Sequence, residues 1–193
     1  MSLEEKKDFD RYINHHTVLY GDSNTGKTKE TAMFLQYLIE SGYSPREISV
    51  LDFAPDFTLN NSNIIGGKID NFYKTSVDCN FWFKNYIIPP RLTSNNKKEL
   101  KNHARHNYNI TKNALKQYQN NPTSFLIIND ISIFLHLGSV KRFLKLIKKA
   151  RTFYGNAYYG TSIKSGSFKS FSRKEQQKVR QLIRKIEFSF YTG

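Results

Sequence analysis

The sequence has few of the residues that mark secreted, metal-clustering or membrane-spanning proteins. It contains one cysteine, Cys79, so it can form no internal disulfide and lacks the cysteine pairs of a zinc site. No apolar run approaches the roughly 18 residues that a membrane helix needs. The charged start of the chain, residues 1–14, lacks the apolar core of a signal peptide. We therefore expect no transmembrane segment and a reducing, cytoplasmic location.

Acidic residues are also scarce. The chain has 16 Asp and Glu against 30 Lys and Arg, which gives a formal net charge of +14. This excess favours polyanionic partners such as nucleic acid, but it identifies none of them. The hydrophobic fraction is only 38%, yet 12 Tyr and 15 Phe supply core volume. A length of 193 residues fits a single domain, 1–193.

One glycine-containing motif follows the short apolar run Thr17–Tyr20. It has the form G-x-x-x-x-G-K-T and is followed by a segment with helical spacing of apolar residues. Its glycines let the backbone curl so that several N–H groups point at one phosphate chain. Its lysine would reach the β- and γ-phosphates, and its threonine hydroxyl would bind Mg²⁺. The motif comprises Gly21, Asp22, Ser23, Asn24, Thr25, Gly26, Lys27 and Thr28, and we add Lys29 to the predicted nucleotide-binding set.

This motif resembles the phosphate-binding loop (P-loop) of the P-loop NTPases. The resemblance implies a three-layer α/β/α fold with a mostly parallel sheet, which binds a nucleoside triphosphate with Mg²⁺. No Asn-Lys-x-Asp signature for guanine occurs in the chain, so ATP is favoured over GTP.

A second motif has two alignments. The apolar run Phe125–Ile128 ends in Asn129-Asp130, and this resembles the Walker B strand of P-loop ATPases, which usually ends in Asp-Glu. In one alignment Asp130 is the metal-linked carboxylate and shares Mg²⁺ with Thr28. In the other, Asn129 takes the metal-side place and Asp130 activates water. We favour the first, because a neutral amide is a weak Mg²⁺ partner; in both, Asp130 and Lys27 are predicted to be catalytic.

Two further polar groups stand at predicted strand ends. Asp52 closes the second strand, whose end lies near the same crevice in open α/β sheets. It is a candidate for the missing catalytic base, as in RecA-like ATPases, or for an acceptor-binding or structural turn. Asn156 lies on the fourth strand, where many ATPases place a γ-phosphate sensor, and we include it in the nucleotide-binding set.

Apolar spacing and turn residues predict an alternation of strands and helices. A short amphipathic helix is expected within residues 1–14, and a polar, basic helical insert over residues 91–121. A capping box is expected to begin the last helix at Ser172-Arg173-Lys174-Glu175. The strands are expected at 16–20, 48–53, 125–128, 153–159 and 186–192, and the other helices at 27–41, 139–152 and 172–185.

Basic residues concentrate in two of these predicted segments, the helix 139–152 and the tail 164–185. They could contact the phosphates of DNA or RNA. Alternatively, Arg151 could reach the nucleotide of a neighbouring subunit in an oligomer. Solvated helix faces would give the same pattern.

Three functions follow from these features. The first is a Mg²⁺-dependent ATPase that acts with nucleic acid or another macromolecule. The second is a P-loop kinase that phosphorylates a small molecule, with Asp52 orienting the acceptor. The third is a switch that binds ATP with little turnover, which the absence of Asp-Glu makes credible.

Overall fold

The computed structural model describes residues 9–55, 57–59, 63–65, 67–74, 79–163 and 166–193. Its centre is a six-stranded sheet in the order β5-β2-β6-β7-β1-β8, in which every strand pair is parallel. The predicted three-layer α/β/α fold is confirmed, and the sheet is wholly rather than mostly parallel. The strands are β1 (His16–Gly21), β2 (Ile48–Asp52), β5 (Phe81–Lys84), β6 (Phe125–Asn129), β7 (Thr152–Tyr158) and β8 (Phe188–Tyr191).

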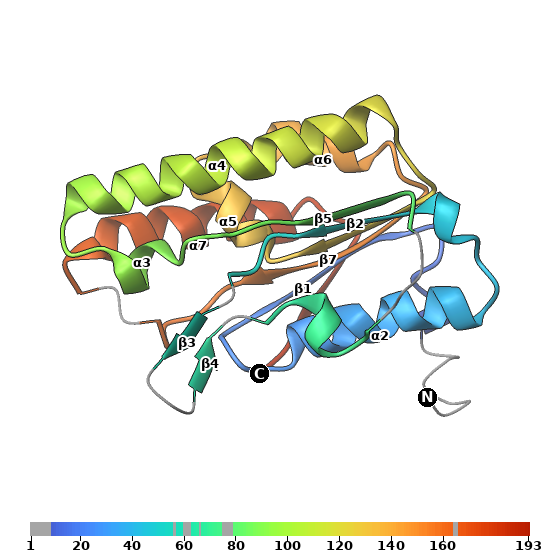
Figure 1. Cartoon of the computed structure of the whole chain (residues 1–193), viewed down its shortest axis with the longest axis horizontal. Coiled ribbons are helices and arrows are strands. Elements are labelled where there is room, and N and C mark those ends of the chain that lie inside the picture. The colour runs from blue at the N-terminus through green and yellow to red at the C-terminus, as the bar shows by residue number, and fades with distance from the viewer. Residues whose placement is uncertain (1–8, 56, 60–62, 66, 75–78, 164–165) are drawn as a thin grey trace.

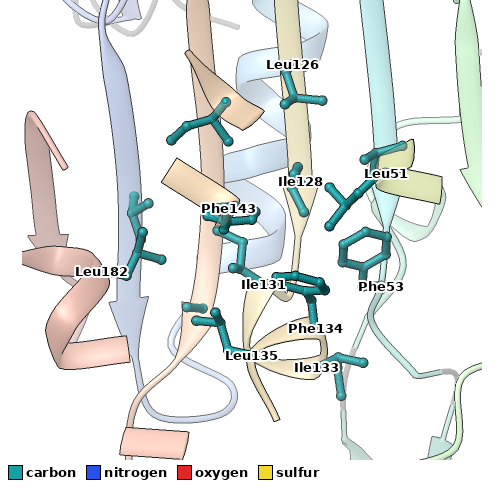
Figure 2. Close-up of a cluster of buried hydrophobic side chains, with 14 of the residues drawn as sticks. Leu51, Phe53, Leu126, Ile128, Ile131, Ile133, Phe134, Leu135, Phe143 and Leu182 are labelled. Carbon is teal, nitrogen blue, oxygen red and sulfur yellow. The ribbon is translucent and has the colours of Figure 1, made fainter. Parts of the chain in front are cut away.

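The helices cover the sheet unequally (Figure 1). One face carries α2 (Lys27–Glu40), whose inner residues pack with β2 and β6. The other carries α4 (Lys97–Asn120), α5 (Ile131–Leu135), α6 (Val140–Ile147) and α7 (Lys169–Ile183). Figure 2 shows side chains of the short helix α5 beside the strand residues Leu51 and Ile128 and beside Phe53, which directly follows β2. Parallel strands with both faces covered are buried throughout, which explains why β2, β6 and β7 are continuous runs without polar alternation.

Shorter elements connect these layers. A two-stranded antiparallel hairpin, β3 (Phe57–Leu59) and β4 (Asn63–Ile65), lies outside the main sheet. The short helix α3 (Pro90–Thr93) precedes α4, and 3-10 turns span Pro45–Glu47, Ile69–Asn71 and Gly166–Phe168. Within the described ranges, no helix combines the length and apolar character needed to cross a bilayer.

Two predicted helix boundaries are wrong. The helix expected over 139–152 ends at Ile147, because Thr152 already pairs with Phe125 as the first residue of β7. The last helix begins at Lys169, so Ser172 and Glu175 lie inside it and form no capping box. Glu175 turns toward the protein interior instead. The predicted N-terminal helix lies mostly outside the described residues.

The segment 91–121, predicted to be a polar, basic helical insert, contains helix α4, which packs on the core of the fold. Helix α4 buries a stripe of residues that includes Leu100, Ala104, Leu115 and Tyr118. Ala114, Leu115 and Tyr118 share the same core cluster as residues of α5, α6 and β6. The apolar pattern of this helix is weak in the sequence, because three of its buried positions are the small or polar residues Ala104, Asn107 and Thr111.

The connections create a crevice beside the P-loop. The chain leaves β1 into α2 on one face and leaves the neighbouring β7 toward α7 on the other face. Ligands of open α/β folds bind at such a point, outside the carboxyl ends of the strands. The loop that follows β1 is therefore placed where a ligand is expected.

Candidate nucleotide-binding site

The backbone of residues 21–28 has the geometry of an anion-binding loop. Gly26 has φ 83° and Asn24 has φ 61°, and both residue types tolerate this left-handed region. Helix α2 starts at Lys27, and no side chain caps its N-terminus. Its first N–H groups therefore remain available to an anion, and the helix dipole adds to the attraction.

Lys27 folds back over this loop. Its side chain is only 8% exposed, and its ammonium donates to the carbonyl of Asp22 and, at 3.1 Å, to Oγ1 of Thr25. Burial lowers the pKa of Lys27, while attraction to Asp130 and Asp22 opposes this shift. A cation held within the loop in this way is suited to a phosphate chain.

Asp22 fastens the loop to the segment that follows β7. Its carboxylate accepts hydrogen bonds from the hydroxyl of Ser162 and from the N–H groups of Thr161 and Ser162 at 3.0 Å. Burial would raise the pKa of Asp22, but these bonds and that of the Ser23 N–H outweigh it and lower the pKa to about 2. Gly160 lies so close that a Cβ there would overlap this carboxylate. Asp22 is thus a fixed anion that shapes the loop.

Asn129, and not Asp130, contacts the P-loop threonine. Its Oδ1 accepts from the Thr28 hydroxyl at 3.2 Å and from Nδ2 of Asn156 at 2.8 Å. Its Nδ2 donates to Oδ1 of Asp52 and to the carbonyl of Gly67, both at 2.8 Å. Every hydrogen-bonding position of this buried amide is occupied, so its orientation is fixed.

This network explains why an amide occupies the place where Walker B strands carry Asp. An aspartate at position 129 would set its carboxylate against that of Asp52, and two buried like charges are unfavourable. Asp52 is 1% exposed, and burial raises its pKa to about 6, although Lys68 and the hydrogen bonds from Ile69 and Asn129 oppose the shift. Lys68 Nζ lies 3.9 Å from its Oδ1. At the carboxyl ends of these two neighbouring strands, β2 carries the buried acid Asp52 and β6 carries the buried amide Asn129.

The position of Asp52 does not support the catalytic role expected for it. Its carboxylate accepts from the Ile69 N–H at 2.7 Å, from the Ala54 N–H at 3.2 Å and from Asn129. It is absent from the described residues that line the cavity beside the P-loop. Asp52 holds Asn129, which in turn holds Thr28.

Asp130 is the acid at the carboxyl end of β6 that lines the cavity. It follows β6 with φ 55°, a left-handed conformation that begins α5. Its N–H donates to Oδ1 of Asn156 at 3.0 Å, and its Oδ1 accepts from the Ser132 hydroxyl. Burial raises the pKa of Asp130; the Ser132 bond opposes this, and the charge of Glu175 adds to it. The carboxyl end of β6 therefore presents one acid to the loop of Lys27.

Asn156 connects the two halves of the site. Besides its bonds to Asn129 and Asp130, its Nδ2 donates to Oγ1 of Thr31 on α2 at 2.8 Å. It also lines the cavity. The γ-phosphate sensor role stays a prediction; the contacts show that Asn156 fixes the backbone of Asp130.

A cavity of about 510 Å³ brings these groups together. Three residues that the sequence did not single out also line it, namely Arg91, His136 and Glu175. The sequence assigned Glu175 to a capping box at the start of the last helix. Because α7 begins earlier, at Lys169, Glu175 lies inside the helix instead. Gly21, Asp22 and Asp52 are not among the described lining residues of the cavity. The predicted site residues that line it are Ser23, Asn24, Thr25, Gly26, Lys27, Thr28, Lys29, Asp130 and Asn156.

The donor set fits Mg²⁺ bound together with phosphates. Among the residues that the structure describes, no three His, Cys, Asp or Glu side chains form a metal-binding cluster. Mg²⁺ rarely uses such a cage and takes one or two protein oxygens, waters and phosphate oxygens. Thr28 and Asp130 both line the cavity and supply a hydroxyl and a carboxylate.

Arg151 lies far from this site. It directly precedes β7, so it is at the amino edge of the sheet, opposite the P-loop. Its guanidinium lies 5.6 Å from the ring centre of Phe125. A role at a neighbouring subunit's nucleotide stays a prediction.

No family model and no curated protein matches the chain. Among solved structures, it is similar to the Pif1 helicase from Candida albicans, with 12% identity and a TM-score of 0.43 over 100% of this chain and 39% of the helicase. It is also similar to the flagellar accessory protein FlaH from Methanocaldococcus jannaschii, with 13% identity and a TM-score of 0.38 over 87% of this chain and 73% of FlaH. The chain thus spans well under half of the helicase. Both likenesses are low, so the interpretation of the site depends on its own geometry.

Proposed function

We propose that this protein binds ATP with Mg²⁺ at the P-loop and hydrolyses it. One observation carries the proposal: the buried ammonium of Lys27, the first residue of α2, and the carboxyl of Asp130, which follows β6, line the same cavity. Phosphoryl transfer needs a cation on the phosphates and an acid that orients the nucleophile and metal. These two groups meet both needs.

The geometry supports the second of the two Walker B alignments. The hydroxyl of Thr28, the predicted Mg²⁺ ligand, donates to the neutral amide of Asn129. Asp130, the next residue in the chain, lines the cavity. We propose that Mg²⁺ is held by Thr28 and the phosphates, and that Asp130 orients the attacking water. The ion would supply charge neutralisation of the phosphates, as in other P-loop sites.

The direct test measures ATP binding and phosphate release in parallel. We expect binding of ATP in the presence of Mg²⁺ and release of phosphate at a rate that rises with enzyme concentration. Binding without release of phosphate would support the switch. Formation of ADP without free phosphate would support the kinase, and no binding at all would refute the nucleotide site.

We further propose that nucleic acid is the macromolecular partner, because the charge of the chain is segregated. Residues 91–185 contain twenty-one Lys and Arg and only three acids, Glu99, Asp130 and Glu175. The last two line the cavity. Helices α4, α6 and α7 of this segment cover one face of the sheet (Figure 1). Their exposed basic residues include Lys97, Lys98, Lys101, Arg105, Lys112, Lys116, Lys141, Arg142, Lys145, Lys169, Arg173, Lys174 and Arg180.

This basic face predicts a salt-dependent interaction with DNA or RNA. Reversal of Lys141, Lys145 and Lys148 to Glu should weaken binding at least tenfold at low salt, since each lost phosphate contact removes a released counterion. The slope of log Kd against log salt should fall by up to about 3, because each lysine that contacts a phosphate contributes about 0.9. Fluorescence anisotropy with labelled single- and double-stranded DNA and RNA measures both. Lys149 is left intact because it donates to the carbonyl of Gln119.

The control variant reverses Arg46 and Lys74, which are exposed outside the basic face. It should bind nucleic acid with little change. Equal loss in both variants would indicate a general charge effect. Binding of anionic vesicles but not of nucleic acid would assign the face to a membrane surface and overturn this part of the proposal.

A further inference from the structure

The P-loop is contacted by a residue that lies far from it in the chain. Thr192 directly follows strand β8, which pairs with β1 at the edge of the sheet. Its N–H donates to the carbonyl of Tyr20 at 2.9 Å, so the pairing of the two strands continues to the start of the loop. Figure 1 shows the end marked C beside the loop between β1 and α2. The segment after β8 therefore reaches the P-loop from the outer edge of the sheet.

Two contacts place Thr192 against the loop. Its Oγ1 lies 2.9 Å from Oγ1 of Thr25, a residue 167 positions earlier in the sequence. A Cβ at Gly21 would lie 2.8 Å from both the carbonyl oxygen and Oγ1 of Thr192, which is closer than real Cβ atoms come. The first glycine of the motif thus leaves the space that Thr192 occupies.

The hydroxyl of Thr25 has all its hydrogen-bonding positions occupied. It donates to the carbonyl of Asp22 at 3.0 Å, and its oxygen accepts from Nζ of Lys27 at 3.1 Å. A hydroxyl has one donor and two acceptor positions, so the second lone pair accepts from the Thr192 hydroxyl. The other acceptor near that hydroxyl, the Tyr20 carbonyl, is 3.5 Å away and already accepts the Thr192 N–H.

The position of the Lys27 ammonium depends on this arrangement. Its two acceptors in the loop are the Asp22 carbonyl and the Thr25 hydroxyl. The side chain of Asp22 is fixed by the segment after β7, and that of Thr25 by Thr192. An ammonium has three N–H donors. With two of them directed at the loop, the third can donate to a phosphate oxygen in the cavity that Lys27 lines.

We propose that Thr192 is a positioning residue for ATP binding, which acts through Thr25 to direct the ammonium of Lys27 toward the phosphates. This rests on the proposed function. Thr192 is absent from the described lining of the cavity, so it acts through the loop and not on the reacting atoms. A loop that is fixed before the ligand arrives loses less conformational freedom on binding, and this preorganisation raises affinity.

The same contacts couple strand β8 to the nucleotide. If the contact of Thr192 with the loop strengthens ATP binding, bound ATP must strengthen that contact by the same factor. The Thr192 N–H reports this effect, because it is bonded to the Tyr20 carbonyl. We expect its hydrogen exchange to slow when ATP and Mg²⁺ are added.

The main test is Thr192→Val, which keeps the shape of the side chain and removes the hydroxyl. We expect ATP affinity to fall about 3- to 10-fold, the range for one neutral hydrogen bond. The KM for ATP should rise, while kcat stays close to wild type. Thr192→Ser restores the hydroxyl and should bind ATP as the wild type does. Ser189→Ala, at an exposed position of β8, is the matched control and should be unaffected.

A double-mutant cycle with Lys27→Ala separates positioning from general support of the fold. If Thr192 acts through the ammonium, Thr192→Val changes ATP affinity much less in the Lys27→Ala background than in the wild type. If Thr192 only supports the fold, the two losses add. Titration of a fluorescent ATP analogue into the four proteins measures this, and additive losses would overturn the proposal.

Three further results would also overturn it. They are unchanged ATP affinity in Thr192→Val, failure of Thr192→Ser to restore the affinity, and hydrogen exchange at Thr192 that does not respond to ATP. In each case ATP binding by the wild type leaves the nucleotide site intact. A wild-type protein that does not bind ATP refutes the proposed function itself.

Discussion

Replacement of Lys27 by alanine is expected to weaken ATP binding by about 10- to 100-fold and to reduce phosphate release at least tenfold. The ammonium is buried within the P-loop and is held by the Asp22 carbonyl and by Thr25. A hydrogen bond to a charged group contributes about 1.5–3 kcal/mol, and each 1.4 kcal/mol is about tenfold in affinity. Titration of a fluorescent ATP analogue, with and without Mg²⁺, measures the effect.

The fold should survive this change, because Lys27 lies at the first turn of α2 and its apolar stem contributes little to the core. Lys141→Ala, at an exposed position of α6, is the matched control for loss of one positive charge. Unchanged ATP affinity and turnover in Lys27→Ala would mean that the loop is an ordinary helix start. An equal loss in the control would point to long-range electrostatics.

Replacement of Asp130 by asparagine is expected to lower phosphate release about 100- to 10,000-fold, the range for loss of a catalytic acid or base. Asparagine has the same size and tolerates the left-handed conformation at φ 55°. The Ser132 hydroxyl can still donate to its side-chain oxygen. The melting temperature should therefore stay close to wild type. The variant lacks only the carboxylate charge that would orient the nucleophile.

The Mg²⁺ dependence of this variant separates the two alignments of Asn129-Asp130. If Asp130 orients water, kcat falls and the Mg²⁺ concentration for half-maximal activity stays constant. If Asp130 holds the metal, that concentration rises. Asp70→Asn is the control, because Asp70 pairs with Lys84 at 2.5 Å and is absent from the described lining of the cavity. Wild-type release in Asp130→Asn would move the catalytic acid elsewhere.

The sequence determined those features that depend on neighbours along the chain. Loop 21–28 and the start of α2 follow from glycine spacing and a helical apolar pattern, and the strand before Asp130 follows from a short apolar run. The end of α6 differs from the prediction: residues 148–151 continue its basic pattern but form a turn and bend, and Thr152 begins β7 by pairing with Phe125. Strand β5 went unrecognised, since its aromatic side chains are only partly buried at a sheet edge.

Tertiary structure alone decided how distant residues share a site. The order β2-β6-β7 sets Asp52, Asn129 and Asn156 on adjacent strands. The buried amide of Asn129 therefore lies between the acid Asp52 and the amide Asn156 and bonds to both. Arg91, His136 and Glu175 are 39 or more residues from their partners or on different helices, and no local pattern links them. Periodicity fixes which face of an element is buried, but only the packing of α3, α5 and α7 above the carboxyl ends of the strands fixes which polar groups meet there.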